Sequence, residues 1–115
     1  MNKGEVEEKL NLITAQFYKK MVGKGPKRVR TTIIDDLIIV RIERYDNIIF
    51  NNLKRSEEGI ELLKMIRKKL FNLFKNEIKA KYENLISQEI KEIYYDSEKV
   101  ASEIVLTITI KENIL

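Results

Sequence analysis

The sequence predicts an α+β fold, a two-layer sandwich in which an antiparallel four-stranded sheet packs against two helices, the second of them long. Apolar residues recur every three or four positions in two long segments, and two pairs of short segments are rich in β-branched residues. Hydrophobic residues make up 43% of the 115 positions, which is enough for a core. We therefore expect a single domain over residues 1–115.

The first predicted helix covers about residues 5–21. Its apolar stripe has spacings of three and four and consists of Val6, Leu10, Ile13, Phe17 and Met21. Gly23 and Gly25 then predict a helix cap and a turn, and Pro26 cannot continue a helix. This order of elements does not fit a nucleotide-binding phosphate loop, which follows a strand and opens a helix.

A β-hairpin is predicted next, with strands at about residues 27–34 and 37–44 and Asp35-Asp36 as a two-residue turn. A metal-binding or acid–base role for the two aspartates is the less favoured alternative. The turn sets a register that places Arg30 opposite Arg41. The face toward the core then carries Val29, Thr31, Ile33, Ile38, Val40 and Ile42.

Asp46 is expected to cap a short helix that ends at about Leu53, and Ser56 to cap a long helix that runs to about Ile86. Two closing strands are predicted at about residues 90–95 and 104–111, joined by a loop over residues 96–102. The complete order, α-β-β-(α)-α-β-β, is also that of a ferredoxin-like βαββαβ fold whose first strand has moved to the end.

The long helix predicts a homodimer. Thirty residues at 1.5 Å each span about 45 Å, whereas a domain of this size is about 35 Å across. We expect part of the helix to overhang the sheet, with Phe71, Leu73 and Phe74 covered by a second copy of the chain. The alternative is a helix that breaks near Asn76 and packs entirely within one chain.

The absence of cysteine and histidine removes disulfides, thiolate nucleophiles, the commonest general base and the usual transition-metal ligands. We therefore expect no catalytic residues, no cofactor and no metal site. No segment has the roughly 20 apolar residues that span a bilayer, and no signal peptide is visible. The sequence accordingly predicts a soluble, cytoplasmic protein without membrane insertion.

The basic residues are concentrated in one segment, because residues 9–34 contain seven cations and no acid. Like charges placed opposite each other destabilise a sheet, so Arg30 and Arg41 require a negative partner. That partner is either a carboxylate such as Glu43, or one from a dimer mate, or a bound anion held by guanidinium groups. The residues of the predicted anion site are Lys24, Lys27, Arg28, Arg30 and Arg41. Nucleic acid is not favoured as the anion, because few aromatic residues accompany these cations.

The chain resembles the MpsC-like family. The resemblance rests on Gly23-Lys24-Gly25-Pro26, on Val29-Arg30 and on the run from Ile34 to Arg41, and it extends to the long helix through Gly59, Arg67 and Leu70. It departs from the family pattern after the second strand, at residues 45–48, and before the third strand, at residues 86–88.

This resemblance implies a soluble accessory of a sodium-translocating, membrane-potential-generating system, with a membrane protein as partner and no catalytic residues to carry over. The predicted function is therefore a non-catalytic accessory or regulatory protein. The alternative is a regulatory module that binds an anion, a nucleotide or nucleic acid through the basic segment 19–30 and Arg41.

Overall fold

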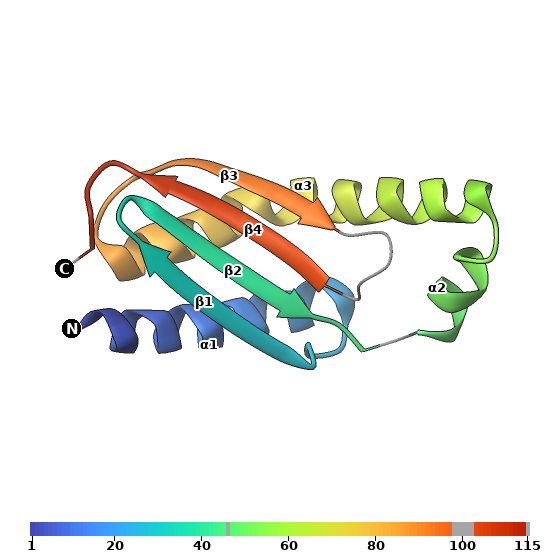
Figure 1. Ribbon diagram of the computed structural model, residues 1–115, viewed down its shortest axis with the longest axis horizontal. Helices are drawn as coiled ribbons and strands as arrows, with labels where there is room; N and C mark the ends of the chain where they lie inside the picture. Colours follow the sequence, from blue (N-terminus) through green and yellow to red (C-terminus); the bar gives the residue numbers. More distant parts are fainter. Residues whose placement is uncertain (46, 98–102, 115) are drawn as a thin grey trace.

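The chain forms two layers, with two long helices packed on one face of a four-stranded sheet (Figure 1). The computed structural model describes residues 1–45, 47–97 and 103–114. The elements are α1 (Lys3–Val22), β1 (Arg28–Ile34), β2 (Leu37–Glu43), α2 (Ile48–Leu53), α3 (Glu57–Ile86), β3 (Ile90–Ser97) and β4 (Glu103–Ile110). The predicted α+β fold is confirmed, and the comparison with a permuted ferredoxin-like topology stays an interpretation.

The sheet is antiparallel, with the strand order β1-β2-β4-β3. The predicted register of the hairpin is confirmed, because Arg30 lies opposite Arg41. At the turn Asp35 has a φ of 52°, a left-handed conformation that aspartate tolerates. The carbonyl of Asp36 accepts a hydrogen bond of 3.0 Å from the amide of Ile110, which ties β4 to the turn.

The strands β3 and β4 extend further toward the loop that joins them than the sequence indicated. Asp96 and Ser97, expected in the connecting loop, pair with Val105 and Ile104 instead. Ladder hydrogen bonds use backbone groups, so polar residues continue a strand wherever the neighbouring strand continues. The rest of the predicted loop, residues 98–102, lies outside the described residues.

The helix α1 ends at its predicted cap and begins slightly before its predicted start. The side chain of Asn2 accepts a hydrogen bond of 2.9 Å from the amide of Glu5, so the helix begins two residues earlier than its apolar stripe indicated. At the other end Gly23 has a φ of 90°, and its amide donates to the carbonyl of Lys19 at 2.7 Å. The predicted cap and turn are therefore confirmed.

The short helix α2 has a different cap from the predicted one. The side chain of Asn47 accepts hydrogen bonds from the amides of Ile49 and Phe50, at 2.8 and 3.4 Å. Asp46, the predicted cap, lies outside the described residues. Asparagine and aspartate are about equally good caps, so sequence alone does not choose between two adjacent ones.

The long helix α3 runs without interruption from Glu57 to Ile86, so the alternative of a break near Asn76 is wrong. Ser56 is its cap, as predicted, and accepts a hydrogen bond of 3.0 Å from the amide of Gly59. Glycine is required at position 59, because a Cβ there would lie 1.8 Å from the carbonyl oxygen of Leu53. Gly59 thus lets α2 approach α3 closely.

The N-terminal half of α3 projects beyond the sheet, with α2 beside it (Figure 1). Phe71, Leu73 and Phe74 were expected to be covered by a second copy of the chain, but two of them are covered by side chains of the same chain. Phe71 is buried and stacks on Tyr95, with ring centroids 4.8 Å apart, and Phe74 meets the ring of Phe17 edge-on at 5.9 Å. Leu73, by contrast, is 78% exposed. The expectation for Phe71 and Phe74 is wrong because β3 and α1 extend beneath them.

A pair of hydroxyl groups lies within the core between α1 and α3. The hydroxyls of Thr14 and Tyr82 are 2.5 Å apart, and Thr14 also donates to the carbonyl of Leu10 at 2.6 Å. Burial raises the pKa of Tyr82 far above its ordinary value. Both side chains are fully buried with their hydrogen bonds satisfied, as a stable core requires.

Candidate functional site

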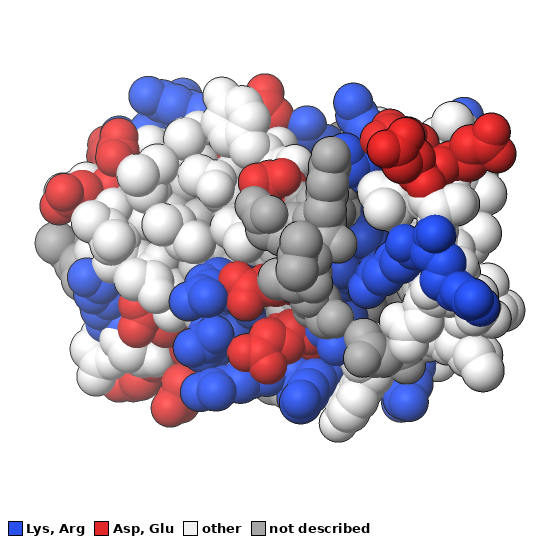
Figure 2. Space-filling view, turned by 45° about the vertical axis from the view of Figure 1, so that its right-hand side comes forward, with Lys and Arg blue, Asp and Glu red and all other residues white. Residues whose placement is uncertain are grey.

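Arg30 and Arg41 lie side by side on the sheet face that points away from the helices, and each has a carboxylate partner. A terminal nitrogen of Arg30, Nη2, is 3.2 Å from Oε1 of Glu43. Arg41 binds Glu103 with two hydrogen bonds, Nε to Oε1 at 2.7 Å and Nη2 to Oε2 at 3.3 Å. The space-filling view shows positive and negative side chains interleaved over part of this face (Figure 2).

These ion pairs also shift the protonation equilibria of their members. The hydrogen bond and the charge of Glu103 raise the pKa of Arg41, and the hydrogen bond from Arg41 lowers the pKa of Glu103. Carboxylates of the same chain therefore offset the repulsion between the two arginines, which is one of the alternatives that the sequence left open. Whether an external anion binds them as well stays a prediction.

The five residues of the predicted anion site do not converge. Arg28 pairs in register with Glu43, beside Arg30 and Arg41 on the outer face. The amide of Lys27 donates to the carbonyl of Glu43 at 2.8 Å, at the open end of the hairpin. Lys24 lies elsewhere, with its ammonium group 4.7 Å from the centre of the Tyr45 ring. The basic segment is thus divided between the sheet face and the region where α1 ends.

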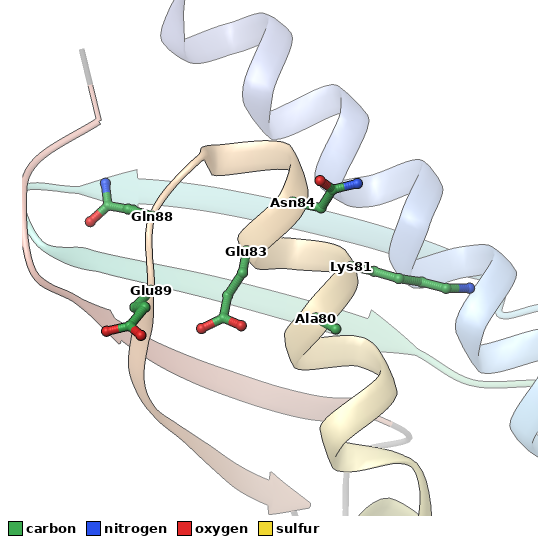
Figure 3. A pocket seen from close by; sticks show the side chains of 6 residues that line it. All are labelled: Ala80, Lys81, Glu83, Asn84, Gln88 and Glu89. Carbon is green, nitrogen blue, oxygen red and sulfur yellow. The ribbon is translucent and has the colours of Figure 1, made fainter.

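The surface depression at the C-terminal end of α3 has a structural role (Figure 3). Glu83 accepts a hydrogen bond of 2.8 Å from the amide of Ile90, which fixes the entry into β3. Gln88 exchanges two hydrogen bonds of 3.0 Å with the backbone of Glu112. Lys81 extends away from the carboxylates (Figure 3). Among the described residues, no three potential metal ligands gather in one place.

Two further arginines, which had no predicted role, lie in the interior. Arg44 follows the end of β2 and is 8% exposed, and Arg67 comes from the middle of the buried face of α3 and is 9% exposed. The sequence did contain a signal for Arg67, because it lies four residues after Leu63 and four before Phe71, where the apolar stripe calls for a hydrophobic residue.

Side chains from helices and strands surround these arginines. Tyr18 of α1, Phe50 of α2, Leu70 of α3 and Tyr95 of β3 line a small cavity together with Arg44 and Arg67. The guanidinium carbon of Arg67 lies 5.7 Å from the centre of the Phe50 ring, a cation–π distance. Burial raises the pKa of Tyr18, and the positive charges of Arg44 and Arg67 oppose that rise.

A family model described as the Na+-translocating membrane potential-generating system (MpsC) matches residues 2–112. The chain belongs to the MpsC family. The match includes every helix and strand described above, and it confirms the resemblance carried by the hairpin and the long helix. No curated protein and no solved structure matches the chain. Within the described part of this MpsC-family chain, no helix combines the length and the apolar character needed to cross a membrane.

Proposed function

We propose that this MpsC-family protein is a non-catalytic, cytoplasmic accessory or regulatory protein of a sodium-translocating, membrane-potential-generating system. The family match over residues 2–112 is the observation that carries the proposal. The structural roles of three carboxylate residues support the non-catalytic part of the proposal. These residues could in principle act as an acid, a base or a metal ligand, but each of them shapes the backbone. Glu83 binds the amide that opens β3, and Asp35 and Asp36 form the hairpin turn.

The proposal is tested in membrane vesicles from cells that lack this protein. We expect the sodium-dependent membrane potential, followed with a potential-sensitive dye, to fall in the deletion strain and to recover when the wild-type chain is expressed again. Expression of an unfolded variant such as Gly59→Trp should not restore it. An unchanged potential in the deletion strain would refute the proposed role.

The same protein is then isolated with detergent-solubilised membranes. Association with a membrane protein that survives nuclease treatment supports the accessory role. Association that nuclease abolishes, and that weakens steeply with salt, would favour the nucleic-acid-binding alternative, because phosphate contacts release counterions.

We also propose that the protein works as a homodimer through the overhanging part of α3 together with α2. Leu62, Met65 and Leu73 are exposed and fall within one side of α3, because the spacings of three and eight residues are close to one and two turns of the helix. Ile48 and Ile49 of α2 are exposed as well. A second copy of the chain has the same apolar surface, so a contact with two-fold symmetry would cover the apolar surfaces of both copies.

Sedimentation analysis tests the dimer. The wild-type chain should sediment at twice its 13.6 kDa mass, and Met65→Glu combined with Leu73→Glu should sediment as a monomer. Leu12→Glu, which changes an exposed leucine on α1, is the matched control and should remain dimeric. A wild-type monomer at all concentrations would rule the dimer out.

A further inference from the structure

The exposed face of the N-terminal half of α3 carries a regular pattern of spacings. Four exposed residues follow one another at intervals of four, three and four positions, namely Glu58, Leu62, Met65 and Lys69. This alternation is the heptad spacing of a helix that packs along a second helix. The stripe lies in the part of α3 that projects beyond the sheet (Figure 1), and its leucine and methionine are 43% and 53% exposed. The described part of the chain therefore leaves these apolar groups uncovered.

The two ends of this stripe carry opposite charges. Glu58 lies at the N-terminal end and Lys69 at the C-terminal end, and among the described residues neither has an ion-pair partner. The flank of the stripe repeats this order, because Glu61 precedes Lys68 by one heptad. Glu61 is 3.6 Å from Lys64 of the same helix, in a contact that leaves the glutamate side chain 70% exposed. An acidic section of the helix thus precedes a basic one, with the apolar pair between them.

We propose that two copies of the chain pair through this stripe with their α3 helices antiparallel, so that Glu58 of each copy meets Lys69 of the other. The inference rests on the homodimer proposed above and adds its orientation, its register and the residues that select them. With a two-fold axis between Leu62 and Met65, the leucine of each copy faces the methionine of the other. The same register sets Glu58 opposite Lys69, because each of them lies four residues outside the apolar pair.

Charge selects this arrangement among the possible pairings of two α3 helices. Parallel helices in register would set Glu58 against Glu58 and Lys69 against Lys69, and like charges across an interface repel. Sliding the antiparallel pair by one heptad in one direction places Lys69 against Met65. Sliding it in the other direction places Glu58 against Leu62. Only the central register matches apolar with apolar and acid with base, as the charged positions of coiled coils do when they set orientation.

Leu73 extends the contact from α3 to α2. It lies 14 residues after Gly59, which is close to four helical turns, so it faces the side of α3 on which Gly59 admits α2. In the antiparallel register Leu73 reaches just past the N-terminus of the second α3, because it lies four residues beyond Lys69. The exposed Ile48 and Ile49 belong to the helix that packs there. Exposed apolar residues of both helices therefore contribute to one interface.

Charge reversal tests the orientation by sedimentation equilibrium. Lys69→Glu should weaken association by about ten-fold or more, because it sets two carboxylates against each other at both ends of the interface. Glu58→Lys should weaken association in the same way by opposing two ammonium groups. The chain that carries both substitutions again has complementary ends and should associate about as tightly as the wild type. Lys81→Glu, which reverses an exposed lysine in the C-terminal half of α3, is the matched control and should not change association.

Chemical cross-linking provides a second readout, because the sequence contains no cysteine. Chains with Glu58→Cys and chains with Lys69→Cys should be joined to each other by a short thiol cross-linker when the two are mixed. Neither should be joined to its own kind, because the register separates identical positions by 11 residues, about 16 Å along the helix. A parallel dimer would give the opposite result.

The outcomes separate this inference from the homodimer itself. A wild-type chain that is monomeric at all concentrations would remove both. A wild-type dimer that Lys69→Glu leaves unchanged, or a doubly reversed chain that associates no better than the single variants, would overturn the antiparallel register and leave the homodimer in place. Cross-linking between identical positions would do the same.

Discussion

Two pairs of arginines occupy the two sides of the sheet, and they obtain their negative partners differently. Arg30 and Arg41 lie on the outer face, where strand register sets Glu43 and Glu103 beside them. Arg44 and Arg67 lie in the interior, where aromatic and aliphatic side chains line a small cavity with them. The two arginines of the outer pair come from one hairpin, and those of the inner pair come from elements distant in the sequence.

The two locations differ in what a charge costs the fold. An exposed ion pair between neighbouring strands forms with side chains that water already solvates, so it adds little and costs little. A buried guanidinium without a carboxylate is retained at a cost to stability. We infer from its carboxylate partners that the outer pair is structural.

The first prediction concerns a substitution that should disrupt the interior around Arg67 and leave the outer face with Arg30 and Arg41 intact. Gly59→Ala places a Cβ 1.8 Å from a backbone oxygen of Leu53, and a backbone atom cannot yield as a flexible side chain would. The variant should lose about 3 kcal/mol or more in the free energy of unfolding, measured by urea denaturation. It should also displace α2, and with it the Phe50 ring beside Arg67.

Gly25→Ala is the control, because a Cβ at that position meets no atom within 4 Å. We expect its free energy of unfolding to stay within about 1 kcal/mol of the wild type. Similar losses in both variants would show that α2 does not approach α3 as closely as described.

The second prediction sharpens the contrast between Arg41, which has a carboxylate partner, and Arg67, for which the described residues supply none. Arg67→Met should have a free energy of unfolding about 1 kcal/mol higher than that of the wild type, because it removes a desolvated charge and its repulsion from Arg44. Urea denaturation in chloride buffer measures this change. A loss of stability instead would mean that Arg67 has a stabilising partner in the folded chain.

The third and smallest effect concerns the outer pair. Arg41 lowers the pKa of Glu103 in the folded state, so the ion pair stabilises the fold at pH values above the ordinary glutamate pKa of about 4.3. That contribution is lost as the pH falls through the lowered pKa of the folded state. Glu103→Gln should therefore lower the urea midpoint slightly at pH 7, and the difference between the two proteins should disappear at pH values below the lowered pKa of Glu103.

High salt should reduce the effect at pH 7, because both side chains are near the surface. Glu8→Gln changes an exposed acid on α1 and serves as the control. A salt-independent difference between Glu103→Gln and the wild type would contradict the view that this pair is solvated.

Local patterns in the sequence predicted the hairpin and its register, the cap at Gly23 and the cap of α3 at Ser56. In each case residues near in sequence determine the geometry. A two-residue turn fixes which side chains face each other, the Gly23 amide donates to a carbonyl four residues earlier, and the Ser56 side chain accepts from an amide three residues later. The family resemblance was predicted from the same region, and the match over residues 2–112 confirms it.

Contacts between distant segments decided the rest. The sequence placed Arg30 opposite Arg41 but did not fix Glu103 as the partner of Arg41, because the neighbour of β2 in the sheet follows 60 residues later in the chain. It did not bring Arg44 and Arg67 together for the same reason. The amino-acid sequence by itself determined the helices, the strands and the hairpin register through short-range sterics and hydrogen bonds. Only the tertiary structure decided which charged side chains lie beside a carboxylate at the surface and which are buried, because that depends on which surfaces pack together.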